Sequence, residues 1–418
     1  MTVMSTSIPQ ALQATLPGVS LSVLVVLLAA YFLWQAVSRP QPAVDQCKST
    51  AGSEDSIDLS WVEPLSTFEI EATPEIQYRP FKDGKYHLTM GIGKMPEECW
   101  IELDDTYRTK MALKRRLLQT QRDMVTAFHP DGWEGSYEAL QTQVDFITKR
   151  FPNLFSKTLV GVKNHILNEE WDIRRSSSLW ETYHPTEVMG MLTLDDYVVM
   201  VKDKVAVPGE DAPQYRVKAG TVCFPGGWKV KDKLGLSVFS LHAGKVPDYE
   251  TKIALSMNRF FERLKVQEPV QRFNYHLDPS PELFHPKSHH NTEAQPAQLE
   301  DLYFRVERQC LRRLPRTRAI VFQIRTYLYR LADMFDTTPQ LMKQPNLRLD
   351  EAIARRWRAS IDQLDGPLAK YKNKGVWEAA VVDALEKWLS EHEGKRVDTV
   401  AGVCTPIQLG DGSGVVNV

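Results

Sequence analysis

The chain has 418 residues, of which 43% are hydrophobic and 25% charged, and its formal net charge is -2. This length can bury one large core or two modest ones, and the near-neutral charge gives no support to a nucleic-acid partner. The five cysteines are isolated and include no C-x-x-C pair, which speaks against a disulfide framework, a zinc knuckle or an iron–sulfur cluster.

The first predicted element is the apolar segment Val19–Val37, which contains no charged residue. As a helix it would span roughly the ~30 Å hydrocarbon layer of a membrane. A cleaved signal peptide is the alternative, but the tail before the segment contains no Lys or Arg and so lacks a basic region. Arg39 and Lys48 follow the segment, and the positive-inside rule places the chain after them in the cytosol. We therefore expect a single-pass membrane protein of the endoplasmic reticulum with a cytosolic C-terminal domain.

Residues 38–56 are rich in Pro, Ser and Ala, which is typical of a flexible linker. After the linker, apolar residues recur at helical spacing in 111–128 and again in 137–151, and predict two amphipathic helices. Short apolar runs at 197–201 and 221–224 predict strands, the second of which leads into a Pro-Gly-Gly turn.

Residues 302–313 and 319–327 alternate apolar and polar side chains on either side of a short turn, and predict a β-hairpin. The second strand carries Arg325 on its polar face. An arginine there is expected where a sheet wall meets an anionic group, or in a surface strand with salt bridges, and both interpretations remain open. Residues 350–392 read as mostly helical, with breaks at Gly366-Pro367 and near residue 374.

The signatures of several common enzyme classes do not occur in this sequence. It has no H-E-x-x-H, P-loop, dinucleotide fingerprint or Ser-His-Asp signature. A cytochrome P450 is rejected because the glycines follow Cys223 instead of preceding it, and because the chain is short for that fold. The adjacent His289 and His290 have the chemistry of metal ligands, but histidines in so polar a loop are more often solvated.

Among the ten histidines, His242 has the sequence context of a cofactor ligand. It ends the run Leu236–Leu241, just before Gly244 and Pro247 turn the backbone. A histidine at the end of an apolar helix can reach a buried cofactor while its other ring nitrogen bonds a nearby carbonyl. Local sequence alone still favours a structural histidine at this position.

Four groups of residues, in order and at plausible spacing between residues 78 and 372, point to one family. They are Tyr78-Arg79-Pro80-Phe81 with Trp100-Ile101-Glu102-Leu103-Asp104; Cys223-Phe224-Pro225 with Trp228 and His242; Asn258-Arg259-Phe260-Phe261 with Arg272 and Asn274; and Arg305-Val306-Glu307-Arg308-Gln309 with Leu311-Arg312-Arg313-Leu314-Pro315 and Ile324-Arg325-Thr326-Tyr327. In this combination the chain resembles the haem-dependent oxidative N-demethylase alpha-subunit-like family.

This resemblance implies an α+β fold in which a PAS-like antiparallel β-sheet core with flanking helices holds haem b. The iron would be bound by His242, and oxygen activated there would oxidise an N-methyl amine and release formaldehyde. One or two of the hairpin arginines would pair with the haem propionates, and Glu307 would be a polar group of the pocket. The residues implied to bind the cofactor are His242, Asn274, Arg308, Arg312, Arg313 and Arg325.

Two stretches near His242 depart from the family pattern. The usual Phe-Pro-Ser-Arg-Trp reads Phe224-Pro225-Gly226-Gly227-Trp228, and the usual His-x-Pro-Val-Pro is one residue longer, from His242 to Pro247. Because both stretches flank the expected iron ligand, the resemblance leaves the substrate and reaction type open.

The expected organisation is a tail at 1–18, a transmembrane anchor at 19–37, a linker at 38–56, a haem-binding PAS-like catalytic domain at 57–375, and a C-terminal helix with a disordered tail at 376–418. No flavin, nicotinamide or iron–sulfur motif occurs in the sequence, so an oxygenase of this kind needs electrons from a separate reductase, or peroxide. A small amine is the expected substrate. A haem-binding sensor or carrier, and a haem-free scaffold that keeps the family fold, are the alternative functions.

Overall fold

A computed structural model describes residues 56–60, 62–81, 89–287, 295–336 and 349–392. The chain divides into two units, Met1–Gly52 and Ser53–Val418, and every described residue belongs to the second. The predicted anchor at Val19–Val37 and the loop histidines His289 and His290 lie outside the described residues.

The membrane localisation that the sequence predicted is corrected by the structure. None of the helices in the described part of the chain is both long and apolar enough to cross a membrane. The longest of these helices, α11 (Lys374–His392), carries Glu378, Asp383 and Lys387 along its length, and such charges are costly in hydrocarbon. The prediction had rested on the apolar residues 19–37 and on the basic residues that follow them, which lie outside the described residues.

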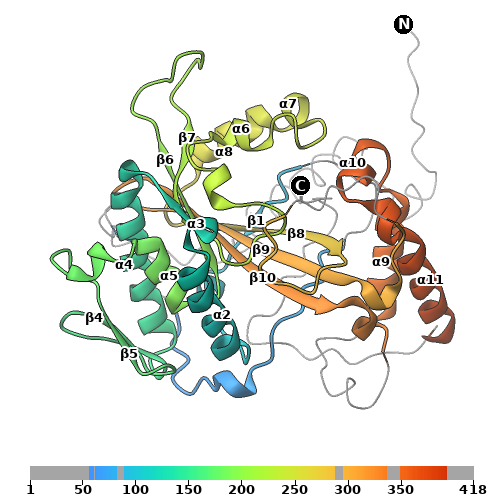
Figure 1. The fold of residues 1–418 in the computed structure, drawn as a ribbon, viewed down its shortest axis with the longest axis horizontal. Helices are drawn as coiled ribbons and strands as arrows, with labels where there is room; N and C mark the ends of the chain where they lie inside the picture. Colours follow the sequence, from blue (N-terminus) through green and yellow to red (C-terminus); the bar gives the residue numbers. More distant parts are fainter. Residues whose placement is uncertain (1–55, 61, 82–88, 288–294, 337–348, 393–418) are drawn as a thin grey trace, which may run out of the picture. The chain divides into compact units, whose positions relative to one another are not determined.

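An antiparallel seven-stranded sheet in the order β1-β8-β9-β10-β6-β7-β2 forms the centre of the described fold (Figure 1). Its strands are β1 (Gly93–Lys94), β2 (Thr126–Phe128), β6 (Asp196–Lys202), β7 (Tyr215–Thr221), β8 (Val270–Asp278), β9 (Tyr303–Arg313) and β10 (Ile320–Arg330). A smaller antiparallel sheet consists of β3 (Phe155–Lys157), β4 (Gly161–Asn164) and β5 (Glu169–Asp172). Together with its helices this is the α+β class that the sequence predicted.

The predicted hairpin is confirmed as β9 and β10, which pair from Tyr303 and Arg330 at one end to Arg313 and Ile320 at the turn. Because side chains alternate between the two faces of a strand, Phe322 and its even-numbered neighbours point one way and Arg325 points the other. A register shift after Val199 marks a bulge between β6 and β7.

Helices and 3-10 turns connect these strands. They are η2 (Ile70–Ala72), η3 (Glu97–Cys99), α2 (Tyr107–Thr120), α3 (Arg122–Val125), η4 (Pro130–Gly132), α4 (Trp133–Arg150), η5 (Ser178–Glu181), α5 (Pro185–Leu192), η6 (Val230–Asp232), α6 (Val238–His242), α7 (Tyr249–Lys252), α8 (Ala254–Arg263), η7 (Leu299–Asp301), η8 (Leu331–Met334), α9 (Glu351–Asp362), α10 (Gly366–Tyr371) and α11. The helix predicted at 111–128 ends earlier, because residues 126–128 pair with β7 as strand β2. The helix predicted at 137–151 is α4, which begins four residues sooner.

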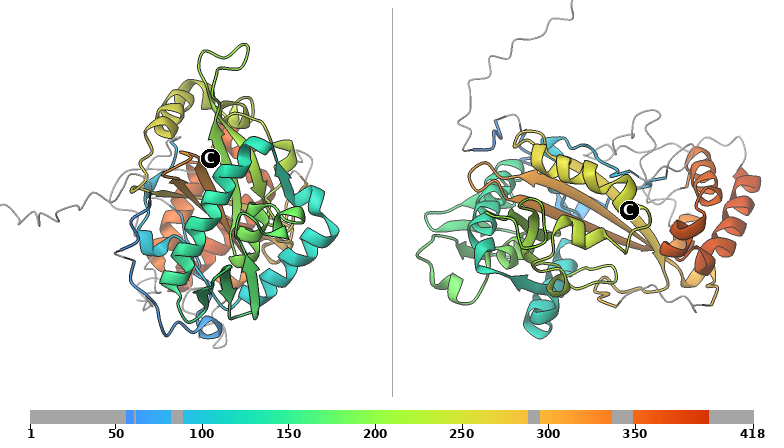
Figure 2. Two further views of the ribbon diagram at one scale, coloured as in Figure 1. Left: turned by 90° about the vertical axis from the view of Figure 1, so that its left-hand side faces the viewer. Right: turned by 90° about the horizontal axis from the view of Figure 1, so that it is seen from above.

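The two faces of the sheet are covered by different helices (Figure 2). On one face, Leu140 and Val144 of α4 pack in the same core cluster as Val199. On the other face, Met257 of α8 packs in a cluster with Val198. Each buried apolar side chain of this size stabilises the fold by roughly 1.5–3 kcal/mol. The layer of α6, α7 and α8 on the second face is the part of the fold that carries His242.

A third cluster joins the C-terminal helices to the end of the sheet that β8, β9 and β10 form. Trp357 of α9 and Trp377, Val381 and Leu385 of α11 are buried there with Phe304 of β9. Helices α9 and α11 lie side by side in Figure 1. Helix α11 runs across the boundary that the sequence predicted at residue 375, so this boundary falls inside a packed helix.

Candidate functional site

A cavity of about 720 Å³ lies against the face of the sheet that α6 and α8 cover. Its apolar wall includes Val198 and Met200 of β6, Leu311 of β9, and Phe322 and Ile324 of β10. The volume is in the range of small-molecule and cofactor sites, about 300–1,000 Å³. An apolar wall with a few polar groups is also what such sites usually have.

His242 lines this cavity from the end of α6. Ser237 caps the N-terminus of this helix, and its side-chain oxygen accepts a hydrogen bond from the backbone N–H of Ser240 at 3.1 Å. His242 comes four positions after Val238, one helical turn further on, and its imidazole Nδ1 lies 2.7 Å from the carbonyl oxygen of Val238. Because a carbonyl can only accept, Nδ1 carries the proton and Nε2 keeps its lone pair. The ring also stacks on Tyr249, with 4.9 Å between centroids.

The environment keeps the His242 imidazole neutral. Burial lowers its pKa to about 4, opposed by the hydrogen bond to the Val238 carbonyl and assisted by the positive charges of Arg272, Lys233 and Lys245. A neutral imidazole with one nitrogen fixed by a carbonyl is the form that binds a metal, and the carbonyl sets which nitrogen is available. His242 therefore has the protonation state and tautomer of a metal ligand.

A polar cluster from β8, β9 and the end of α10 lines another part of the cavity wall. Glu307 Oε2 accepts hydrogen bonds from the amides of Gln309 at 2.9 Å and Asn274 at 3.4 Å. Lys372 Nζ donates to Asn274 Oδ1 and to the carbonyl of Tyr275, each at 2.9 Å. Burial and the nearby Arg272 lower the pKa of Lys372 to about 8, while Glu307 raises it. Asn274 thus connects a carboxylate and an ammonium group through its single amide.

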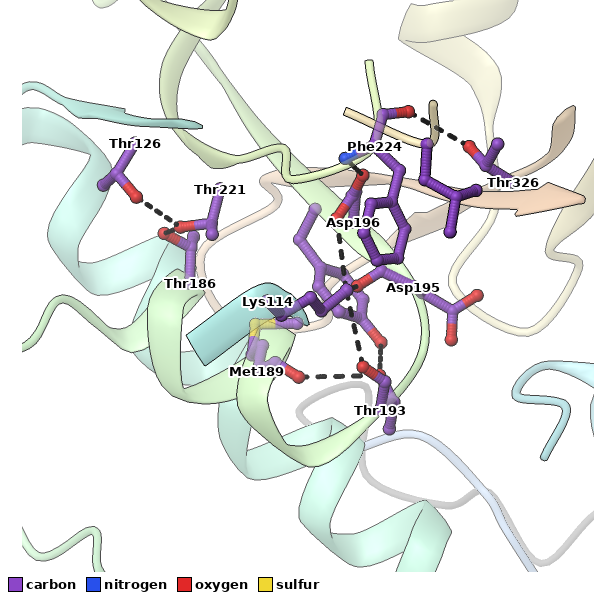
Figure 3. A network of polar contacts seen from close by, with 12 residues as sticks. Lys114, Thr126, Thr186, Met189, Thr193, Asp195, Asp196, Thr221, Phe224 and Thr326 are labelled. Carbon is purple, nitrogen blue, oxygen red and sulfur yellow. Dashed lines mark hydrogen bonds and ion pairs between the residues drawn. The ribbon is translucent and has the colours of Figure 1, made fainter. Parts of the chain in front are cut away.

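The loop between β7 and η6 is held to the sheet by its main chain. Asp196 Oδ2 accepts a hydrogen bond from the backbone N–H of Phe224 at 2.7 Å, and Lys114 forms an ion pair with the other oxygen at 3.1 Å (Figure 3). Thr326 Oγ1 donates to the Phe224 carbonyl at 3.2 Å, and Arg305 donates to the same oxygen at 2.6 Å. These buried contacts set the course of the loop on the way to its cavity-lining residues.

Gly226 is the point at which this loop comes closest to the polar cluster. A Cβ atom at this position would lie 2.9 Å from Cε1 of His276 and 3.1 Å from Oε1 of Glu307. Such contacts are too short for a side chain without movement of its neighbours. Only glycine fits here in the observed arrangement, beside Oε1 of Glu307.

Residues 91–382, more than half of the chain, match the model of one family: haem-dependent oxidative N-demethylase, alpha subunit-like. The chain belongs to this family. The matched residues include His242, the polar cluster around Glu307 and the whole of the β9–β10 hairpin. The family name indicates haem dependence and makes the cavity beside His242 the candidate haem site of this demethylase-like chain.

The residues of this family member fit such a group. The cavity has the size of a cofactor site, and His242 offers an imidazole lone pair on its wall. Five lysine and arginine residues also line the cavity, and such side chains suit the carboxylates of haem propionates. They are Lys233, Lys245, Arg272, Lys370 and Lys372.

The predicted site residues separate into two groups in the structure. His242 and Asn274, together with Glu307, line the cavity of the demethylase-like chain. None of the four predicted arginines is among the lining residues. Their assignment as cofactor ligands stays a prediction, and the structure gives each of them other partners.

Three of these arginines point to the opposite face of the sheet, where acidic residues cover them. Arg308 forms an ion pair with Glu102 at 3.3 Å. Arg312 forms an ion pair with Glu97, and Arg325 forms one with Asp104. Arg313 donates to the hydroxyl of Tyr215 at 2.7 Å and to the carbonyl of Phe261. Arg308, Arg312 and Arg325 thus lie in salt bridges, as one of the two interpretations expected, but these pairs are buried and not on a surface strand.

Sequence reasoning did not assign a role to Arg272 or Lys372. Arg272, Asn274 and His276 are spaced two residues apart on β8, which is the signal that would have placed all three on the cavity face. Lys372 has no comparable signal, because it reaches the cavity only through the way α10 and α11 pack.

Proposed function

We propose that this protein is a haem-dependent oxidoreductase that oxidatively removes a methyl group from an amine bound in the cavity, with haem b as its cofactor. The family match supports haem dependence and N-demethylase-like chemistry. The observation that carries the proposal is His242. Its imidazole is neutral, its Nδ1 is fixed by Val238, and it stands on the wall of a cavity of cofactor size.

In this proposal His242 Nε2 would bind the iron, and Lys233 and Lys245, which precede and follow its helix closely, would pair with the propionates. The apolar wall around Leu311 and Phe322 would cover the ring. The strand order supports a PAS-like core, since β6 and β7 lie beside β10 and the helices between β7 and β8 carry the ligand.

When bound, haem supplies the activation of oxygen that these residues cannot provide. In the overall reaction an N–CH3 group and O2, with two electrons and two protons, give N–H, formaldehyde and water. We propose that a separate reductase supplies the electrons. The chain itself binds and orients the amine, with the carboxylate of Glu307 held in place by Gln309 and Asn274.

The cofactor is tested by reconstituting the full chain with hemin and recording its absorption spectrum. We expect a Soret band that His242→Ala abolishes or shifts, while His129→Ala, an exposed histidine outside the cavity, leaves it unchanged. Protein that stays colourless with hemin, or a His242→Ala variant with an unaltered band, contradicts the assignment.

The activity is tested by adding reductant, oxygen and a panel of methylamines and assaying formaldehyde. Formaldehyde formed by the parent and lost in His242→Ala supports the reaction. A haem-bound protein that stays silent across the panel contradicts the enzymatic function and favours a haem-binding sensor or carrier.

A further inference from the structure

We propose that the substrate carries a carboxylate in addition to its methylated amine, so that an N-methylated amino acid is its chemical class. The proposal rests on the proposed function, since it names the substrate of the same cavity. It follows from the charges of the cavity wall and from the side-chain amide of Asn274, which bonds both Glu307 and Lys372.

The cavity wall has an excess of positive charge. Among the described residues that line it, five are lysines or arginines and one, Glu307, is a carboxylate. The two propionates of a haem would balance two of these charges and leave an excess of two. Small methylamines are cations at neutral pH, so a substrate of this kind would enter a wall that repels it. An additional anionic group on the substrate removes this conflict.

Four of the five cationic residues form two groups on different elements. Lys233 follows η6, and Lys245 lies three residues after His242; next to burial, the charge of Lys245 lowers the pKa of Lys233. Arg272 is on β8 and Lys372 follows α10, and Arg272 lowers the pKa of Lys372 in the same way. Each group therefore holds like charges close enough to repel, and Glu307 offsets this repulsion only in part at Lys372, whose pKa stays below its usual value. Lys233 and Lys245 suit the propionates, whereas Lys372, which Asn274 joins to Glu307, and Arg272 on the same strand as Asn274 suit a substrate carboxylate.

The second group stands beside the one carboxylate of the wall. Asn274 donates to Glu307 Oε2 at 3.4 Å and accepts from Lys372 Nζ at 2.9 Å, so a single amide separates the negative group from the positive one. In an α-amino acid a single carbon separates the ammonium from the carboxylate. A zwitterion of this size can place its ammonium at Glu307 and its carboxylate at Arg272 and Lys372.

Glu307 has an oxygen available for this contact. Its Oε2 accepts the amides of Asn274 and Gln309, whereas Oε1 accepts no hydrogen bond from the described residues. The gap between Oε1 and Gly226 is too narrow for a methyl group, so the ammonium reaches this oxygen from the cavity that Glu307 lines. The methyl group to be oxidised would be attached to the nitrogen that this oxygen binds, and it leaves as formaldehyde with the stoichiometry given above.

A matched pair of ligands tests the carboxylate directly. The haem-loaded full chain is titrated with N-methylglycine and with dimethylamine, which differ by the carboxylate, and binding is followed by calorimetry and by the shift of the Soret band. We expect N-methylglycine to bind about tenfold more tightly or better, and its methyl ester to lose this advantage. Equal or tighter binding of dimethylamine, or no binding of N-methylglycine, overturns the proposal.

Two variants and a control locate the effect. Lys372→Gln is expected to weaken the binding of N-methylglycine by about tenfold or more, whereas dimethylamine, a cation, binds no more weakly than to the parent protein. Glu307→Gln is expected to weaken the binding of both amines. Lys252→Gln, an exposed lysine paired with Asp248 outside the cavity, changes neither. Equal weakening of both amines by Lys372→Gln contradicts the assignment of its charge to the carboxylate. If that variant fails to fold, the ligand pair on the parent protein still decides.

Failure of this proposal is distinguishable from failure of the haem assignment, because haem uptake is read in the same samples. A coloured protein that prefers dimethylamine overturns the substrate class alone. A colourless protein overturns the haem assignment. The calorimetric comparison of the two amines then still tests whether the charges of the cavity wall favour a carboxylate.

Discussion

Gly226 shows how one missing side chain can shape the site. Replacing it by alanine puts a methyl group 3.1 Å from Glu307 Oε1 and 2.9 Å from the His276 ring. We expect Gly226→Ala to displace the carboxylate, weaken amine binding and cost about 1–3 kcal/mol of unfolding free energy. Chemical denaturation and ligand titration measure both effects.

Gly375 provides the matched control for this substitution. It lies in helix α11, and a Cβ there would meet nothing within 4 Å. Gly375→Ala is therefore expected to leave amine binding unchanged and to stabilise the fold by about 0.5–1 kcal/mol, the usual gain of alanine over glycine in a helix. If Gly226→Ala binds amines like the parent protein, the close approach to Glu307 has no functional role.

At the same scale, the burial of His242 makes the stability of the haem-free protein depend on pH. Its folded pKa is about 4, while a histidine in the unfolded chain titrates near 6.5. Between these values the unfolded state binds more protons, so stability is complete above about pH 6.5 and is lost as the pH falls towards 4. The pKa difference sets an upper value of about 3 kcal/mol, which the partial solvent access of the ring reduces.

The measurement is the unfolding free energy of the parent and of His242→Gln at a series of pH values. The parent is expected to lose roughly 1–3 kcal/mol more than the variant between pH 6.5 and 4. Other buried groups, such as His184 with a pKa of about 3, contribute to both proteins equally. Parallel pH profiles would contradict a neutral, buried imidazole at position 242.

At the scale of elements, the arginine face of the β9–β10 hairpin has a structural role. Arg325 is buried against Asp104, and removing one partner of a buried ion pair leaves the other charge uncompensated. Arg325→Met is expected to lower the unfolding free energy by about 3–5 kcal/mol, and the double variant with Asp104→Leu to recover much of it. Hemin titration of folded Arg325→Met should give the parent spectrum. Lost haem affinity at unchanged stability would instead support a propionate contact.

The elements also show how far the sequence could predict this fold and its site. The hairpin was predictable because alternation over two long strands is a strong local signal, and His242 because it ends an apolar run before a turn. The ion-pair partners of the arginines were not predictable, because Glu97, Glu102 and Asp104 reach that face of the sheet only through tertiary packing. Residues 126–128 continue a helical pattern, yet they form β2 because β7 offers them backbone hydrogen bonds.

At the scale of the whole molecule, the C-terminal helix belongs to the folding unit that contains the site. The indole N–H of Trp377 donates to the carbonyl of Lys372 at 2.9 Å, and Lys374 Nζ donates to the carbonyl of Leu364 at 2.8 Å. Helix α11 thereby fixes the backbone from which Lys372 reaches Asn274. The family match, which extends to residue 382, likewise ends inside this helix.

This packing predicts the outcome of shortening the chain at the domain boundary that the sequence indicated. A chain ending at Gly375 loses four buried side chains of α11, Trp377, Val381, Leu385 and Trp388, and uncovers Trp357. At roughly 1.5–3 kcal/mol for each side chain, the loss is comparable with the whole stability of a typical domain, about 5–15 kcal/mol. We expect this protein to be unfolded or insoluble, whereas a chain ending at His392 keeps the helix and the parent's thermal unfolding and hemin uptake. A soluble, haem-binding chain that ends at Gly375 would show that α11 is dispensable and that Lys372 is positioned without it.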